Sequence, residues 1–151
     1  MEQRILILDD DPMSVDTVAL LVATLGYTAV RCSDQATAIQ RIESEHFDLL
    51  LSDFDMPRCN GLEVVGQLRK RHIEIPVLLM SGDVAAIDTA LADRLKVAEV
   101  LKKPFTVAEL KLALNLTLSP LPVDSTRIIW STVDGYESTP VHGNNSCRFQ
   151  A

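Results

Sequence analysis

Short apolar runs alternate with segments of helical periodicity along most of this chain. The runs are rich in Leu, Val and Ile and have few polar residues inside them, which is typical of strands buried on both faces of a parallel sheet. The predicted strands cover residues 4–9, 27–32, 47–53, 75–81 and 97–101. The predicted helices cover residues 12–25, 34–45, 62–68, 84–96 and 106–118. This fivefold alternation predicts a doubly wound, five-stranded parallel α/β sheet.

Particular residues mark where several of these helices begin and end. Pro12 lies in the first turn of the first helix, where its missing N–H costs no hydrogen bond, and Gly26 follows the last turn. Ser33 or Asp34 can cap the second helix, and Thr106 can cap the last one. These signals agree with the alternation derived from the apolar pattern.

The alternation stops near residue 119. Residues 120–151 are rich in Ser, Thr, Pro, Gly and Asn and show no helical periodicity. We therefore expect one domain over 1–119 and a tail or linker over 120–151, within which 126–133 can form one short strand. No helix-turn-helix pattern follows residue 118, so the chain is either a single-domain protein or one part of a longer protein. The numbering from Met1 favours the first alternative.

Composition and charge narrow the class of protein. The chain has 151 residues, of which 47% are hydrophobic, and its formal charge is −7. Basic residues are clustered only at Arg69-Lys70-Arg71. This scarcity of basic clusters argues against direct binding to nucleic acid. The apolar run Ile5–Leu8 is too short for a signal sequence or a membrane span, so we expect a cytoplasmic protein without membrane contact. The three cysteines lack the spacing of metal ligands.

Reactive side chains gather where the predicted strands end. The first strand ends in Asp9-Asp10-Asp11, and the third ends in Asp53, with Asp55 two residues further on. Ser81 ends the fourth strand, and Lys103 follows the fifth. Because ligands of open parallel sheets bind outside the carboxyl ends of the strands, we expect these side chains to form one site.

The chemistry of this set favours phosphoryl transfer. Crowded carboxylates repel one another unless a cation lies among them, and several hard oxygen ligands suit Mg²⁺. Such a metal offsets the charge of a phosphoryl group, while Lys103 can pair with one phosphoryl oxygen and Ser81 can donate a hydrogen bond to another. Asp53 would be the nucleophile that forms an aspartyl phosphate. Each residue alone could be a helix cap or a surface residue, but their coincidence at one edge favours a site.

Four segments together resemble the receiver domains of two-component response regulators, the fold of the bacterial chemotaxis response regulator. They are ILILDDDP, DLLLSDFDMPRCNG, PVLLMSG and LKKPF, and the resemblance covers residues 3–118. It implies a flavodoxin-like sheet with strand order 2-1-3-4-5 and helices on both faces. It also implies a cis peptide bond between Lys103 and Pro104.

The resemblance assigns a role to each site residue. Asp53 corresponds to the phosphoryl acceptor, and Ser81 and Lys103 correspond to the hydroxyl and the amine that contact the phosphoryl group. Mg²⁺ is the implied cofactor, with Asp10 as a direct ligand, Asp9 acting through water, and Asp53 as a further ligand. Asp55 contributes its backbone carbonyl to the metal.

The resemblance also implies signal relay. A sensor histidine kinase or a histidine phosphotransfer protein would donate the phosphoryl group. Phosphorylation would then alter the face formed by the fourth helix, the fifth strand and the fifth helix, which would bind a downstream protein or form a homodimer. The domain would not be an enzyme toward other molecules, because it promotes only its own phosphorylation and dephosphorylation.

Two positions depart from the family pattern. Val100 stands three residues before Lys103, where the family commonly has a Tyr or Phe that swings inward after phosphorylation. Asp55 is an unusual acidic side chain beside the acceptor. We hypothesise that Asp55, together with Asp83, adjusts the lifetime of the phosphorylated state.

Two other classes of protein remain as alternatives. A pseudo-receiver would keep the fold as a binding module without being phosphorylated, and Val100 is the residue that favours it. A phosphatase of the haloacid dehalogenase type would use Asp53-Phe54-Asp55 as its nucleophile and acid. That family has its acidic pair after the nucleophile, whereas Asp9-Asp10 precedes it here, so the order argues against a phosphatase.

Overall fold

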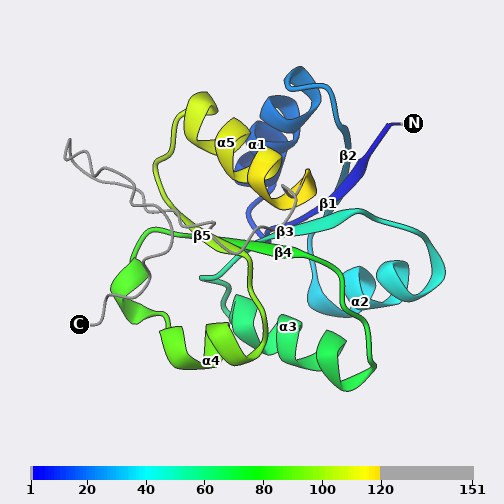
Figure 1. Ribbon diagram of the computed structural model, residues 1–151, viewed down its shortest axis with the longest axis vertical. Helices are drawn as coiled ribbons and strands as arrows, with labels where there is room; N and C mark the ends of the chain where they lie inside the picture. Colours follow the sequence, from blue (N-terminus) through cyan, green and yellow to red (C-terminus); the bar gives the residue numbers. More distant parts are fainter. Residues whose placement is uncertain (1, 120–151) are drawn as a thin grey trace, which may run out of the picture. The chain divides into compact units, whose positions relative to one another are not determined.

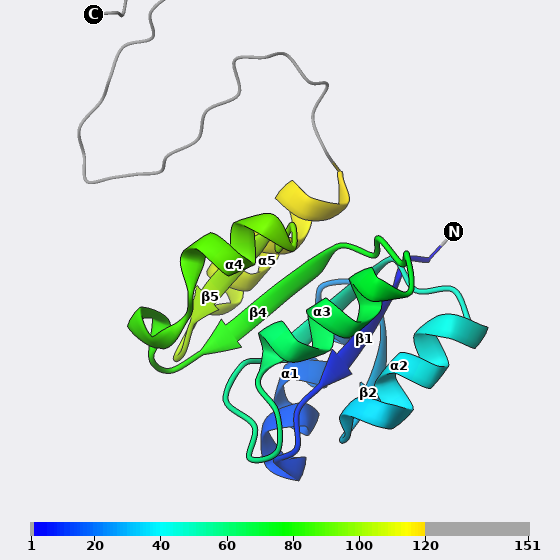
Figure 2. The ribbon, with the colours of Figure 1, turned by 90° about the horizontal axis from the view of Figure 1, so that it is seen from below.

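The computed structural model describes residues 2–119. The strands are β1 (Arg4–Leu8), β2 (Thr28–Cys32), β3 (Leu49–Asp53), β4 (Val77–Ser81) and β5 (Glu99–Lys102). The helices are α1 (Pro12–Thr24), α2 (Gln35–Ser44), α3 (Gly61–Lys70), α4 (Thr89–Arg94) and α5 (Val107–Leu118), with a 3₁₀ turn η1 at Val84–Ala86. All strand pairs are parallel, in the order β2-β1-β3-β4-β5. Figure 2 shows β4 and β5 on one side of the sheet and β1 and β2 on the other. The predicted fold class and strand order are confirmed.

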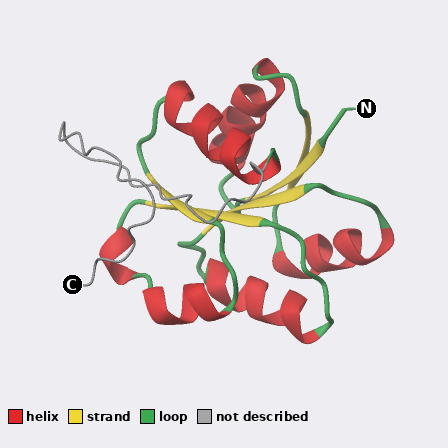
Figure 3. Ribbon diagram, viewed as in Figure 1, coloured by secondary structure: helices red, strands yellow, loops and turns green. Residues whose placement is uncertain are grey.

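The sheet lies between two layers of helices. Helices α1 and α5 cover one face, and α2, α3 and α4 cover the other (Figures 1 and 3). Alternate residues of β1 therefore enter two separate cores: Ile5 and Ile7 pack under α1 and α5, while Leu6 and Leu8 pack on the opposite side. Burial on both faces explains why the central strands β1, β3 and β4 are almost continuously apolar, whereas the edge strands β2 and β5 include exposed polar residues.

The residues expected to begin and end helices do so. Pro12 is the first residue of α1. Asp11 caps this helix, because its side chain accepts a hydrogen bond from the backbone N–H of Met13. Gly26 follows this helix with φ of 100°, a conformation that favours glycine. Asp34, rather than Ser33, caps α2.

The final helix begins with a reciprocal cap. The Thr106 side chain accepts from the backbone N–H of Glu109, whose carboxylate accepts from the backbone N–H of Thr106. The predicted cap at Thr106 is thus confirmed. This cap fixes the start of α5 four residues after Lys103, at the edge of the sheet where the site lies.

The prediction of one helix over 84–96 was wrong. The segment contains η1 and the separate helix α4, with Ile87 between them in an extended conformation. Ile87 is 5% exposed, because this backbone directs its side chain into the core beneath α4. Asp88 then starts a new helix by accepting from the N–H of Leu91. The burial of Ile87 and the new cap at Asp88 therefore stabilise two separate helical segments more than one continuous helix, although the sequence has continuous helical periodicity.

Four strands begin later than predicted: β2 by one residue, and β3, β4 and β5 by two residues each. β4 begins at Val77, after Pro76, which has no N–H to donate to a neighbouring strand. β5 begins at Glu99 because Lys96, with φ of 63°, reverses the chain at the end of α4. The carboxyl ends of the strands, where the site residues lie, are within about one residue of the predicted positions.

Several expectations concern residues that the structure does not describe. The tail over 120–151 and the short strand over 126–133 lie outside the described residues, so the division at residue 119 stays a prediction. Among residues 2–119, no helix is long and apolar enough to span a membrane.

Candidate functional site

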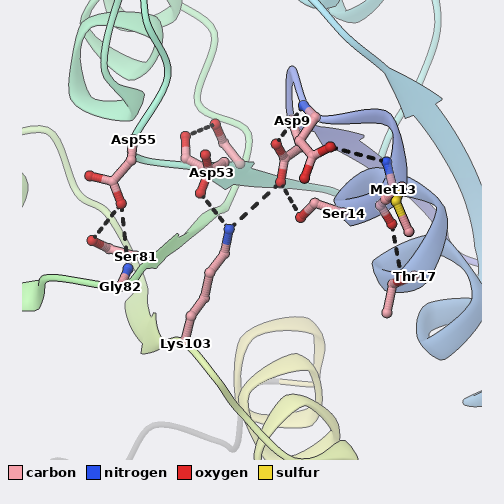
Figure 4. Close-up of polar contacts among 11 residues, drawn as sticks. Asp9, Met13, Ser14, Thr17, Asp53, Asp55, Ser81, Gly82 and Lys103 are labelled. Carbon is pink, nitrogen blue, oxygen red and sulfur yellow. Dashed lines mark hydrogen bonds and ion pairs between the residues drawn. The ribbon is translucent and has the colours of Figure 1, made fainter.

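The predicted site residues converge at the carboxyl edge of the sheet. Asp9 follows β1, Asp53 ends β3, Ser81 ends β4, and Lys103 follows β5. The Lys103 amine lies between two of the carboxylates, as Figure 4 shows: its Nζ is 2.8 Å from Asp53 Oδ1 and 3.7 Å from Asp9 Oδ2. The Lys103–Pro104 peptide bond is cis, as the resemblance implied. Residues from four strands thus meet in one place.

Three of the predicted metal ligands form a compact cluster. One carboxylate oxygen from each of Asp9, Asp10 and Asp53 lies within 4.8 Å of the others. Asp9 and Asp53 are buried, whereas Asp10 is exposed. A set of hard carboxylate oxygens with one open side suits a divalent cation that keeps part of its water, as Mg²⁺ does. The donor set fits the predicted metal.

The Asp9 side chain is held in place by its own loop and by α1. Its Oδ2 accepts a hydrogen bond of 2.6 Å from Ser14 Oγ, and its Oδ1 accepts one of 3.0 Å from the backbone N–H of Asp11. Both oxygens therefore have a donor within the protein. Sequence reasoning missed Ser14, although its place in the first turn of α1, facing back toward the end of β1, could have indicated it.

The site has more negative than positive charge. Burial raises the pKa of Asp53, and the nearby carboxylates of Asp9 and Asp55 raise it further, against the opposing effect of Lys103. Burial alone would lower the pKa of Lys103, but its hydrogen bond and charge interactions with Asp53 outweigh burial and raise it. Both groups thus hold their protons more tightly than usual. This is the expected electrostatic state of a carboxylate cluster that a divalent cation would neutralise.

The Ser81 hydroxyl is hydrogen-bonded to a neighbouring loop. Ser81 Oγ donates to Asp55 Oδ2 at 3.1 Å and accepts from the backbone N–H of Asp83 at 3.0 Å. The backbone N–H of Gly82 also points at Asp55 Oδ2, at 3.4 Å. The sequence analysis gave the Asp55 backbone carbonyl a place in the metal site and the Asp55 side chain a role in the lifetime of the phosphorylated state, but it did not predict this contact with Ser81.

The acceptor loop approaches α3 closely, and a glycine makes that approach possible. A Cβ on Gly61 would lie 2.8 Å from Leu79 Cδ2 and 3.1 Å from the Asp53 carbonyl oxygen. The N–H of Gly61 donates to the Phe54 carbonyl at 3.1 Å. The start of α3 therefore packs directly against the backbone that carries Asp53.

Two further features lie beside the cluster. A hollow of about 560 Å³ opens next to Asp10 between the loops that precede α2 and α3. Val100, which replaces the common aromatic residue, is partly buried against the core beneath α4.

Comparisons with known proteins agree with this geometry. The family of the response regulator receiver domain matches residues 5–115. The transcriptional regulatory protein PhoP of Bacillus subtilis is 29% identical over 72% of this chain and 45% of its own length. The response regulator MprA of Mycobacterium ulcerans is 34% identical over 73% of this chain and 47% of its own length.

A solved structure of a receiver protein has the same fold. The response regulator TrrA of Thermotoga maritima, in complex with Mg²⁺ and BeF, is 26% identical and has a TM-score of 0.70. The match covers 77% of this chain and 99% of that one. By contrast, the chain spans about half the length of the curated relatives named above. The family match over most of the described residues shows that this chain belongs to the response regulator receiver domain family.

Proposed function

We propose that this receiver domain accepts a phosphoryl group on Asp53 from a phosphohistidine of a sensor histidine kinase or a histidine phosphotransfer protein. The observation that carries the proposal is the placement of Asp53. The residue is 4% exposed, and its carboxylate lies within hydrogen-bond distance of the Lys103 amine and belongs to the Asp9–Asp10–Asp53 cluster. A nucleophile, a cationic partner and metal ligands are therefore in one place before any donor arrives.

The residues that would hold Mg²⁺ are Asp9, Asp10, Asp53 and the backbone carbonyl of Asp55. Asp10 is exposed and would be a direct ligand, while Asp9, with both oxygens already hydrogen-bonded, suits contact through water. When bound, Mg²⁺ supplies positive charge that offsets the oxygens of the transferring phosphoryl group. The relative crystallised with Mg²⁺ and BeF supports this choice of metal.

The chain's own groups would carry out the transfer. A carboxylate oxygen of Asp53 attacks phosphorus, the bond from phosphorus to the donor imidazole nitrogen breaks, and the electron pair stays on the imidazole. Lys103 would leave its 2.8 Å contact with Asp53 Oδ1 to pair with a phosphoryl oxygen. Water attack on the aspartyl phosphate would later return the carboxylate and release inorganic phosphate. The domain would act on itself only, as a phosphoacceptor rather than an enzyme.

The output surface would lie on α4, β5 and α5. Three apolar side chains of α5 are solvent-exposed: Val107 at 43%, Leu112 at 59% and Leu116 at 54%. Leu112 and Leu116 also line a hollow of about 320 Å³ between β5 and α5. A downstream protein or a second copy of the domain would cover this surface. Because Val100 has no ring to swing inward, switching would depend on the hydroxyl of Ser81.

The cellular location of such a domain follows from the location of its phosphoryl donor. A receiver that takes its phosphoryl group from the kinase portion of a sensor would work in the cytoplasm. The net charge of −7 supports a protein partner rather than nucleic acid.

Intact mass spectrometry tests the proposal. The full chain is incubated with acetyl phosphate and Mg²⁺ beside the Asp53→Asn variant, and a third sample contains EDTA. We expect one added phosphoryl group in the wild type with Mg²⁺ and none in the other two samples. No adduct in any sample, together with no binding of beryllofluoride, would favour a pseudo-receiver.

A further inference from the structure

Both hydrogen bonds of the Ser81 hydroxyl are made with residues other than Asp53. Ser81 Oγ–H donates to Asp55 Oδ2, and Ser81 Oγ accepts from the N–H of Asp83. Figure 4 shows Ser81 and Asp55 facing each other on one side of the site, with Lys103 pointing at Asp53 beside them. A serine hydroxyl has one proton to donate. While that proton is shared with Asp55, it cannot reach a phosphoryl oxygen on Asp53.

The bond to Asp55 competes well with other partners. Its acceptor is a carboxylate, and such charge-assisted hydrogen bonds are about twice as strong as those between neutral groups. Ser81 is 0% exposed, so bulk water does not compete for its proton. The N–H of Gly82 gives the same Asp55 oxygen a second donor at 3.4 Å, which holds the carboxylate over the end of β4.

We propose that the Asp55 side chain is a latch that keeps the Ser81 hydroxyl in the resting position. Switching then requires the Ser81–Asp55 hydrogen bond to break before Ser81 can donate to the phosphoryl group. This inference rests on the proposed function, because the phosphoryl group on Asp53 is the partner that competes with the latch. Asp55 is thus a positioning residue that sets how readily the domain switches.

The latch predicts tighter binding of a phosphoryl mimic when it is removed. In Asp55→Ala the backbone carbonyl of residue 55 is retained, but Ser81 loses its carboxylate acceptor. Beryllofluoride with Mg²⁺ should then bind about three- to tenfold more tightly, the change expected when one competing hydrogen bond is removed. Isothermal titration calorimetry on the full chain measures the affinity.

Asp83 provides a matched control for charge. Like Asp55, it is an exposed acidic residue that contacts the Ser81 hydroxyl, and its side chain makes no capping hydrogen bond to η1. Its contact with Ser81 comes from the backbone N–H, which Asp83→Ala keeps. If general repulsion by acidic side chains governs binding, Asp83→Ala should tighten binding as much as Asp55→Ala. If the latch governs binding, Asp83→Ala should change the affinity by less than twofold.

A double-mutant cycle with Ser81→Ala separates the latch from every other effect of Asp55. Without the hydroxyl there is nothing for Asp55 to hold, so Asp55→Ala should have little effect on beryllofluoride affinity in the Ser81→Ala background. An equal gain in both backgrounds would overturn the proposal.

Amide hydrogen exchange tests the latch without any phosphoryl group. In the metal-free chain, loss of Asp55 should free the Ser81 hydroxyl to rotate and speed exchange at the N–H of Asp83 several-fold. Unchanged exchange would overturn the latch even if Asp53 is phosphorylated normally. Faster exchange in a chain that neither binds beryllofluoride nor becomes phosphorylated would instead overturn the proposed function, and with it the switching role of Asp55.

Discussion

The two glycines of α3 provide a sensitive test of how the acceptor loop is built. Both lie in the same helix, and neither has a positive φ. A Cβ at Gly61 would meet Leu79 Cδ2 at 2.8 Å and the Asp53 carbonyl at 3.1 Å, whereas a Cβ at Gly66 would meet nothing within 4 Å. The same substitution to Ala should therefore have opposite effects at the two positions.

The magnitudes follow from the surroundings of each glycine. Leu79 is 0% exposed in β4, so it has little space to move away from a new methyl group. Overpacking of this kind costs about 1–3 kcal/mol, and a gain in helix propensity at the first residue of α3 offsets only part of it. We expect Gly61→Ala to destabilise the domain by about 1–2 kcal/mol. Gly66→Ala should stabilise it by about 0.5–1 kcal/mol.

Urea unfolding of the full chain, followed by far-UV circular dichroism, measures both changes in the free energy of unfolding. Gly61→Ala should also weaken Mg²⁺ binding, because the displaced backbone carries Asp53, while Gly66→Ala should leave it unchanged. Equal effects of the two substitutions on stability would refute the close approach between α3 and the acceptor loop.

Two other predictions concern charged groups. The pKa of Asp34 is lowered because its carboxylate accepts from Thr37, so its stabilising effect is complete above the unfolded pKa and is lost as pH falls through the lower folded value. Asp34→Asn, which keeps the cap, should match the wild type at pH 7 but lose less stability in acid-unfolding titrations. Lys103→Met removes the amine that lies beside the carboxylates of Asp53 and Asp9. In EDTA, this change should lower the free energy of unfolding by about 1–3 kcal/mol. Thermal unfolding should show that Mg²⁺ stabilises this variant more than the wild type, and equal stabilisation would contradict the electrostatic account of the site.

Much of the fold was predictable because its physical causes are local. The strands buried on both faces must be continuously apolar, and helix caps such as Asp34 and Thr106 satisfy N–H groups within one turn. The site residues could be grouped because parallel strands place their carboxyl ends at one edge of the sheet. That edge brought Asp53 and Lys103, which are 50 residues apart in sequence, within 2.8 Å.

The features that were missed depend on tertiary contacts. The helix expected over 84–96 is interrupted because the side chain of Ile87 fits into the core, and periodicity alone does not show this. The contacts of Ser14 with Asp9 and of Asp55 with Ser81 depend on how loops from different strands meet. The roles of Asp9 and Ser81 in phosphoryl transfer stay predictions.

The central claim is that Asp53 itself receives the phosphoryl group in a reaction that needs Mg²⁺. Borohydride reduces an acyl phosphate to an alcohol, so a phosphorylated Asp53 would become homoserine, which tandem mass spectrometry locates in the sequence. After treatment with acetyl phosphate and Mg²⁺, we predict homoserine at position 53 and none when EDTA replaces Mg²⁺. Homoserine at Asp9, Asp10 or Asp55, or no conversion at all beside a relative that converts, would contradict the account.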